Sequence, residues 1–140
     1  MAGSNVETVR QGYEAWNRGD REWILEHMAP GFQWRTPPDD PDPGIHLGHE
    51  GVEHYWDAWR EAFGQLKIEI EELMDAGDKV AAFVRRLGIG EVSGVEVQER
   101  VIQVFTFEGG KAVRCEEFYD RRQGLEAAGL AQRSERSSAS

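Results

Sequence analysis

The sequence is short of cysteine and of basic residues. Its one thiol, Cys115, has no second cysteine with which to form an internal disulfide, which indicates a reducing compartment. Lysine and arginine number 16 against 26 aspartate and glutamate residues, so the net charge is −10. Nucleic acids and anionic membranes recruit basic surfaces, and this charge therefore argues against both as partners.

Long hydrophobic runs are also lacking. No apolar segment is long enough to cross a bilayer, and the N-terminus has no basic start followed by an apolar stretch. We therefore predict a cytoplasmic protein. The 140 residues, 39% of them apolar, suit one hydrophobic core. We predict a single domain over residues 1–130 and a disordered tail over residues 131–140, which are rich in serine and charge.

Apolar side chains at helical spacing predict two helices at the start of the chain. Gly19 is expected to end the first helix, because glycine accepts the left-handed conformation of a helix C-terminus. Asp20 is in position to cap the second helix, and Pro30 and Gly31 are expected to end it. The apolar positions are Val6, Val9, Tyr13 and Trp16 in the first helix, and Trp23, Ile24, His27 and Met28 in the second.

A short strand and a third helix follow. Residues 32–36 are predicted to form the strand, and the prolines and aspartates after it indicate a stiff loop without regular structure. The third helix is predicted between Gly48 and Gly64, with one apolar face. That face consists of Val52, Tyr55, Trp56, Trp59 and Phe63.

From Leu66 onward the hydrophobic period changes to two, which is typical of half-buried strands. Helices first and strands last indicate an α+β fold, with helices packed on one face of a mainly antiparallel sheet. A short terminal helix completes the prediction. The predicted strands cover residues 66–71, 80–87, 95–107 and 112–120, the connections cover 76–78, 88–94 and 108–110, and the terminal helix covers 123–130.

The register of the last hairpin determines which polar side chains face inward. Residues 108–110 are interpreted as a three-residue loop, so that position 107 faces position 111. A two-residue loop would place Phe105 beside Arg114 and mix polar with apolar side chains on both faces. The inward face is then predicted to hold Val101, Gln103, Phe105, Val113, Cys115, Glu117 and Tyr119, and the outward face Arg100, Ile102, Val104, Thr106, Arg114, Glu116 and Phe118.

Glu117 is the main candidate for acid–base chemistry on the inward face. A carboxyl group that loses hydration favours its neutral form unless a partner holds it ionised, and groups that work near neutral pH arise in this way. The alternative is an ion pair with Arg85 or Arg86, and the sequence does not decide which arginine faces inward. The outward face, mixed and rich in strand-forming residues, suits a homodimer contact.

Seven large aromatic side chains are candidates for lining one cavity. Large rings that bury well yet carry polar tips suit a flat, polycyclic or aromatic ligand. Aromatic residues at helical spacing are equally typical of an ordinary core, and both interpretations stay open. The seven are Trp16, Trp34, Tyr55, Trp56, Trp59, Phe105 and Tyr119.

Three histidines, at positions 46, 49 and 54, lie close in sequence to two glutamates. His49 and Glu53 share a helical face, but His54 points elsewhere and no second cluster completes the shell of a metal ion. We therefore predict no metal and assign His49 a hydrogen bond at the mouth of the cavity. Cys115 is expected to behave as a small buried apolar residue.

Short motifs occur in order along nearly the whole chain. They are AWNRGD at residues 15–20, the strand at 32–36, Gly48, Ser93 with Gly94, FTFEGGK at 105–111, YDR at 119–121 and LEAAG at 125–129. In this order and spacing, the chain resembles the SnoaL-like branch of the nuclear transport factor 2-like superfamily. The resemblance implies a cone-shaped curved antiparallel sheet, with the N-terminal helices on its concave face enclosing a deep apolar pocket, and it implies a homodimer. Members of the superfamily include polyketide cyclases, ketosteroid isomerase, epoxide hydrolases and dehydratases.

The catalytic groups of ketosteroid isomerase are not retained. Thr36 stands where that enzyme has its base aspartate, and Gln103 where it has an inward carboxylic acid. Gly12 stands where it has a tyrosine on the first helix, with Tyr13 one step round the helix. The resemblance therefore argues against isomerisation by that mechanism. Polyketide cyclases place an acid or base on the sheet that lines the pocket, and Glu117 corresponds to it in position.

Two functions stay open from the sequence. The first is a cofactor-independent isomerase, cyclase or dehydratase in which Glu117 moves a proton and Gln103 or Tyr13 stabilises a developing oxyanion. The second is a non-catalytic dimeric module that binds a small apolar or aromatic ligand or another protein. In both, the substrate-binding candidates are the seven aromatic residues together with Tyr13, Thr36 and His49.

Overall fold

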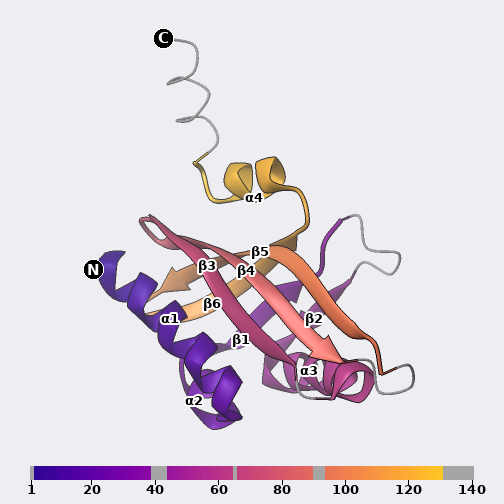
Figure 1. Ribbon diagram of the computed structural model, residues 1–140. Coiled ribbons are helices and arrows are strands. Elements are labelled where there is room, and N and C mark those ends of the chain that lie inside the picture. Colours follow the sequence, from indigo (N-terminus) through magenta and orange to yellow (C-terminus); the bar gives the residue numbers. More distant parts are fainter. Residues whose placement is uncertain (1, 39–43, 65, 90–93, 131–140) are drawn as a thin grey trace.

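The structure is a computed structural model that describes residues 2–38, 44–64, 66–89 and 94–130. Three helices precede most of the strands and a short fourth helix follows them (Figure 1). The predicted α+β class is confirmed. The helices are α1 Ala2–Arg18, α2 Arg21–Glu26, α3 Gly48–Phe63 and α4 Arg121–Ala127, and the strands are β1 Met28–Arg35, β2 Ile45–Leu47, β3 Lys67–Ala76, β4 Lys79–Ile89, β5 Glu96–Glu108 and β6 Lys111–Phe118.

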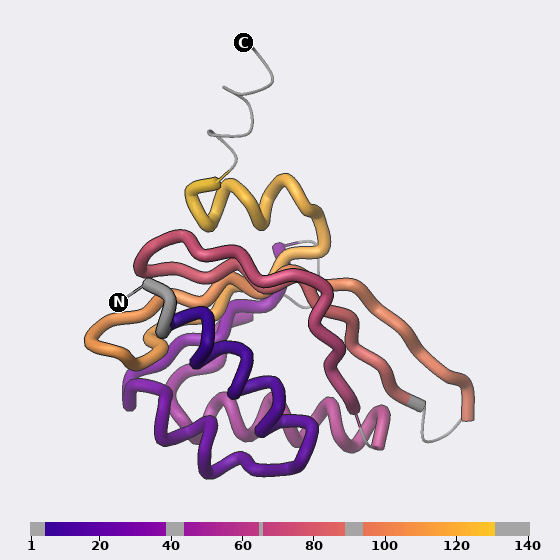
Figure 2. The backbone as a smooth tube through the Cα atoms, turned by 60° about the vertical axis from the view of Figure 1, so that its left-hand side comes forward, coloured from indigo at the N-terminus to yellow at the C-terminus, as the bar shows by residue number. Residues whose placement is uncertain are grey.

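The strands form one curved six-stranded sheet in the order β2-β1-β6-β5-β4-β3. Helices α1, α2 and α3 lie on one side of this sheet and α4 lies on the other, as both views show (Figures 1 and 2). Each side of the sheet therefore has its own hydrophobic cluster, one beneath the first three helices and one beneath α4. Within the described ranges, no helix has the length and apolar character needed to span a membrane.

The helix boundaries follow the predicted signals at three places. Gly19 has φ 79° after the last residue of α1, and Gly64 has φ 60° at the end of α3. Asp20 caps α2 by accepting a hydrogen bond from the backbone N–H of Trp23 at 3.1 Å. Asp120 caps α4 in the same way through the N–H of Gln123, so that helix begins two residues before the predicted start.

The end of α2 was predicted wrongly. Pro30 and Gly31 do not end this helix, because it ends at Glu26 and both residues lie inside β1. The pairing of β1 with β6 shifts register between Met28 and Gln33, and proline is tolerated in such an irregular stretch because it has no N–H to donate to a regular ladder. The strand expected at 32–36 therefore begins four residues earlier and ends at Arg35.

The sheet is mainly antiparallel, as predicted: among the described strands, β1 and β6 pair in parallel and the other pairs are antiparallel. One predicted connection needs correction. Gly88, expected in a connection, lies in β4, where a Cβ atom would come within 3.0 Å of the Phe63 side chain. The absence of a side chain at this position lets the end of α3 approach the sheet. Residues 90–93 of the predicted connection, 39–43 of the predicted loop and 131–140 of the predicted tail lie outside the described residues.

The last hairpin differs from the prediction in its turn but not in its inner face. The turn contains two residues, Gly109 and Gly110, so that Glu108 pairs with Lys111. An extra residue in β6, Val113, then forms a bulge, because Phe107 pairs with Ala112 whereas the preceding residue pairs with position 114. The bulge restores the expected pairing of odd with odd positions. Ala112, instead of Val113, joins the buried cluster under the first helices.

The outer face of the sheet is partly covered by the chain itself. Ile102 and Val104 pack there with Ala128 and Leu130, which follow α4. Gly124 of α4 is buried against Ile102, and a Cβ atom at this position would come within 2.7 Å of the Ile102 Cγ2 atom. The homodimer contact predicted for this face is consequently limited to the part that α4 leaves uncovered.

Gly124→Ala is expected to lower the free energy of unfolding by about 1–3 kcal/mol, because the added methyl group forces α4 away from the sheet. Chemical denaturation monitored by circular dichroism measures this loss. Gln123→Ala on the exposed side of the same helix is the control and should change stability by no more than about 0.5 kcal/mol. Equal stabilities of the two variants would show that α4 does not depend on this close approach.

Candidate functional site

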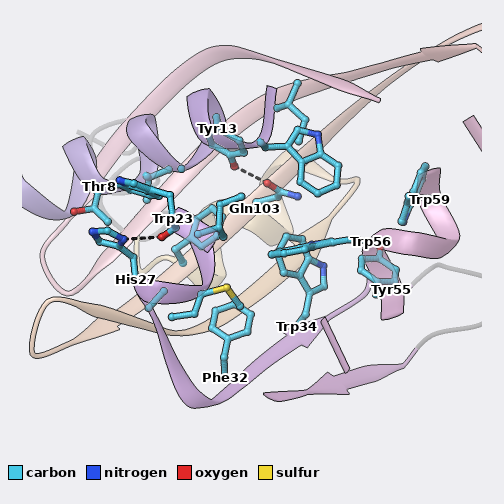
Figure 3. Close-up of a pocket in the computed structure, with 18 of the residues that line it drawn as sticks. Thr8, Tyr13, Trp23, His27, Phe32, Trp34, Tyr55, Trp56, Trp59 and Gln103 are labelled. Atoms are coloured by element: carbon cyan, nitrogen blue, oxygen red, sulfur yellow. Dashed lines mark hydrogen bonds between the residues drawn. The ribbon is translucent and has the colours of Figure 1, made fainter. Parts of the chain in front are cut away.

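A pocket lies between the first three helices and the inner face of the sheet (Figure 3). Its volume is about 100 Å³, and its walls are mostly aromatic and aliphatic. Eight of the predicted site residues line it, namely Tyr13, Trp16, Trp34, Tyr55, Trp56, Trp59, Gln103 and Phe105. The other lining residues are Thr8, Val9, Gly12, Trp23, Ile24, His27, Met28, Phe32, Leu66, Ile68, Arg86, Phe107 and Ala112.

The aromatic rings contact one another edge to face. Trp16 and Trp56 have ring centroids 5.5 Å apart, and Trp34 lies 6.3 Å from Trp56 and 6.4 Å from Phe105. Edge-to-face contacts are a favourable arrangement of aromatic rings and stabilise the packing of this wall. The indole N–H of Trp34 is buried and has no hydrogen-bond partner among the described residues. The indole N–H of Trp16, by contrast, donates to the carbonyl oxygen of Leu66 at 2.8 Å.

A buried polar network runs behind one wall of this pocket. The Tyr13 hydroxyl donates to Gln103 Oε1 at 2.5 Å, and Figure 3 shows this pair among the lining side chains. Gln103 Nε2 donates in turn to Glu117 Oε2 at 2.9 Å. The Tyr55 hydroxyl donates to the other carboxylate oxygen, also at 2.9 Å. The network thus connects α1 and α3 to strands β5 and β6.

Arg86 supplies the counter-charge for Glu117. Its Nη1 atom lies 2.9 Å from Glu117 Oε2, and the same guanidinium contacts the carboxylate of Glu99. The guanidinium also lies over the Trp59 ring, 4.4 Å from its centroid, which adds a cation–π contact. Glu117 is 1% exposed and Arg86 4%, so the ion pair is shielded from solvent. Of the two arginines left open by the sequence, Arg86 faces inward, whereas Arg85 contacts Glu69 and Glu71 at the surface.

Burial changes the acidity of several groups around this network. Burial raises the pKa of Tyr13 well above its ordinary value, and Cys115 and Glu117 raise it further. The pKa of Tyr55 is raised by burial and by Glu117, and the pKa of the Cys115 thiol is raised for the same two reasons. Burial opposes the charge of Arg86, but the carboxylates of Glu117 and Glu99 outweigh it and raise the pKa of Arg86. Both hydroxyls and the thiol are therefore neutral, and the arginine charged, at physiological pH.

The network determines what Glu117 can do. Its carboxylate accepts hydrogen bonds from Tyr55, Arg86 and Gln103, and Glu117 is not among the residues that line the pocket. This arrangement matches the ion-pair alternative for Glu117. A carboxylate so engaged orients its neighbours and is poorly placed to take a proton from a ligand.

Three predicted binding residues lie away from the pocket wall. Thr36 exchanges hydrogen bonds with the backbone of Gly44, and His49 Nε2 lies 3.1 Å from the carbonyl oxygen of Met28. Tyr119 is 39% exposed. Thr36 and Tyr119 directly follow the ends of β1 at Arg35 and β6 at Phe118, and His49 lies in the first turn of α3.

Other lining residues were not assigned to the pocket from the sequence. Trp23 and His27 were placed on the apolar face of α2, and their four-residue spacing was the available signal. The two rings stack 3.8 Å apart, and His27 Nδ1 lies 2.8 Å from the carbonyl oxygen of Trp23 (Figure 3). Phe32 and Arg86 also line the pocket. No group of three or more metal-ligating side chains occurs in the part of the chain that the structure describes.

Gly12→Ala is expected to raise the free energy of unfolding by about 0.5–1 kcal/mol, because alanine is the better residue inside a helix. The new Cβ atom would lie 3.8 Å from Trp23, an ordinary contact, and would narrow the pocket. Thermal and chemical unfolding measure the gain. Gly19→Ala is the control and should instead destabilise, because Gly19 has φ 79°. A loss of stability in both variants would contradict the geometry at position 12.

Comparison with known proteins adds independent information. The sequence model of the SnoaL-like domain family matches residues 9–115. An NTF2-like protein of unknown function from Burkholderia pseudomallei is 25% identical, with a TM-score of 0.74 over 88% of this chain and 95% of the other. Bal32a, from a soil-derived mobile gene cassette, is 24% identical, with a TM-score of 0.77 over 90% and 96% of the two chains. TerC, co-crystallised with polyporic acid, is 25% identical, with a TM-score of 0.73 over 90% and 98%. No curated protein matches the sequence significantly.

Proposed function

Because this chain belongs to the SnoaL-like domain family, we propose that it binds a compact, mainly apolar small molecule between its helices and its sheet. The observation that carries this proposal is an aromatic pocket with one polar wall, formed by Tyr13 and Gln103. An ordinary core would not place a glutamine that is 1% exposed against a cavity. Sites for small molecules typically combine apolar walls with a few fixed polar groups.

The size of the pocket supports a ligand of about one ring. An engineered protein cavity of about 150 Å³ binds benzene, and this pocket has a volume of about 100 Å³. A polycyclic ligand requires the pocket to widen, for example by movement of α2, none of whose residues is fully buried. The co-crystallisation of TerC with polyporic acid supports ligand binding by a protein of this fold.

The second candidate function is acid–base catalysis by a cofactor-independent isomerase, cyclase or dehydratase. The observation that favours it is His27, which lines the pocket. A carbonyl oxygen can only accept, so His27 Nδ1 donates its proton to Trp23, and in the neutral ring Nε2 carries the lone pair. If the protein is an enzyme, His27 is a better candidate base than Glu117. His27→Gln should then abolish turnover while ligand binding persists.

We also propose a cytoplasmic location, from the composition of the chain. A homodimer is proposed from the family and from the part of the outer sheet face that α4 leaves uncovered. Sedimentation analysis of the purified protein tests the dimer directly. A monomer at micromolar concentration would contradict it.

Ligand retention tests the proposed binding function. We expect protein purified under native conditions to release a bound small molecule on unfolding, detected by mass spectrometry, and to bind toluene in an NMR titration. Ala112→Phe places a ring into the pocket from β6 and should weaken toluene binding at least tenfold while the protein stays folded. Unchanged toluene binding in this variant, with its circular dichroism spectrum intact, would place any ligand elsewhere.

A further inference from the structure

The hydrogen-bond directions in the polar wall follow from the charge of Glu117. Glu117 Oε2 lies 2.9 Å from Nη1 of Arg86, which can only donate, and the carboxylate of such an ion pair accepts hydrogen bonds. The atom of Gln103 that faces Glu117 must therefore be the amide nitrogen, at 2.9 Å. The amide oxygen of Gln103 then points the other way, towards Tyr13.

The orientation of Gln103 fixes the proton of Tyr13 in turn. An amide oxygen only accepts, so the Tyr13 hydroxyl must donate its single proton to Gln103 Oε1. Burial keeps this hydroxyl protonated, since it raises the pKa of Tyr13 well above its ordinary value. The Tyr13 oxygen can therefore interact with a ligand by accepting a hydrogen bond through its lone pairs.

The hydroxyl of Tyr55 has different hydrogen-bond partners from the hydroxyl of Tyr13. Tyr55 donates to Glu117 at 2.9 Å, and its pKa is influenced by a hydrogen bond with the Trp59 side chain. An indole N–H only donates, so the Tyr55 oxygen accepts from Trp59. The Tyr55 hydroxyl thus has both a donor and an acceptor role within the protein, whereas the Tyr13 hydroxyl donates to Gln103.

We propose that the pocket selects ligands that carry a hydrogen-bond donor, such as a phenol, an enol or another hydroxyl compound, and that the Tyr13 oxygen accepts this donor. This inference rests on the proposed binding function and specifies its ligand class. It also reverses the role expected from the sequence, in which Tyr13 or Gln103 donates to a developing oxyanion. The Tyr13 hydroxyl already donates its proton to Gln103, so it cannot donate a hydrogen bond to a carbonyl or ether oxygen of a ligand.

Four probes test the direction of this hydrogen bond. Phenol carries a donor and toluene is its hydrocarbon counterpart, whereas anisole carries only an acceptor and ethylbenzene is its counterpart. Dissociation constants for the wild type and Tyr13→Phe are measured by NMR titration. We expect Tyr13→Phe to reduce the affinity for phenol relative to toluene by about three- to tenfold. The ratio of anisole to ethylbenzene affinities should not change.

Two further variants keep the test decisive. Tyr55→Phe removes a hydroxyl from the same wall and is expected to lower the affinities for phenol and toluene by similar factors, so their ratio is retained. Gln103→Met removes the acceptor that holds the Tyr13 proton, so the freed hydroxyl can donate. Anisole should then gain affinity relative to ethylbenzene, a change that a loss of packing alone does not produce.

The outcomes separate this inference from the proposed function. If all four probes bind but Tyr13→Phe weakens anisole as much as phenol, Tyr13 donates to ligands and the inference is overturned while the binding function stands. If none of the four binds folded wild-type protein, the proposed binding function fails and the inference fails with it.

Discussion

Arg86→Met is expected to lower the free energy of unfolding by about 3–5 kcal/mol, a loss typical of a buried ion pair from which one partner is removed. Methionine retains much of the arginine stem, so the loss reports the charge more than the volume. Glu117, 1% exposed, would keep hydrogen bonds from Tyr55 and Gln103 but would have no counter-charge. Denaturant unfolding at pH 7 measures the change.

The neighbouring arginine provides the matched control. Arg85 lies next to Arg86 in β4, but its side chain points to the opposite face and contacts Glu69 and Glu71 near solvent. Ion pairs exposed to water contribute little to stability, so Arg85→Met should be far less damaging than Arg86→Met. Similar losses in the two variants would mean that Arg86 is not the buried partner of Glu117.

Alkaline pH is expected to produce the second large effect. The folded protein raises the pKa of Tyr13, Tyr55 and Cys115 above their ordinary values of 10.0, 10.0 and 9.0, chiefly by burial. The unfolded chain therefore releases these protons at a lower pH than the folded protein. Their contribution to stability is complete below pH 9 and decreases above it, by about 1.4 kcal/mol per pH unit for each group. At pH 11 the three groups together should reduce the free energy of unfolding by several kcal/mol.

Denaturant unfolding at pH 8, 9, 10 and 11 measures this dependence, and Tyr13→Phe isolates one group. Below pH 9 the wild type and the variant should differ by a constant amount, because neither form of the protein titrates tyrosine there. Above pH 10 the wild type should lose stability more steeply than Tyr13→Phe, by about 1.4 kcal/mol per pH unit. Parallel curves up to pH 11 would show that the Tyr13 hydroxyl ionises as easily in the folded protein as in the unfolded chain.

Local signals made much of the fold predictable. Gly19, Asp20 and Gly64 set helix boundaries through the conformation or the hydrogen bonds of single residues, and all three occur where predicted. The family resemblance is confirmed by the match over residues 9–115. The prediction at Pro30 and Gly31 was wrong, because whether a proline ends a helix or lies in an irregular strand depends on which strand pairs with it.

The site was predictable only in part. Eight predicted residues line the pocket because helical and strand periodicity place side chains on a face. Thr36 and Tyr119 lie outside it because they follow the ends of strands, where periodicity no longer fixes the direction of a side chain. His49 lies outside it in the first turn of α3. The inward face of the last hairpin was right for Gln103 and Glu117 although its turn was not, since the bulge at Val113 offsets the shorter turn.

Alternation and helical spacing are local properties, so they predict an α+β fold whose aromatic inner face carries a glutamine and a glutamate. The three-dimensional arrangement was needed to show that Arg86, and not Arg85, contacts Glu117, and that Gln103 lies between this carboxylate and Tyr13. These contacts join residues 14 to 90 positions apart, and their hydrogen-bond directions depend on which charge lies nearest. The periodicity of the sequence contains no information about these long-range contacts or about the directions of their hydrogen bonds.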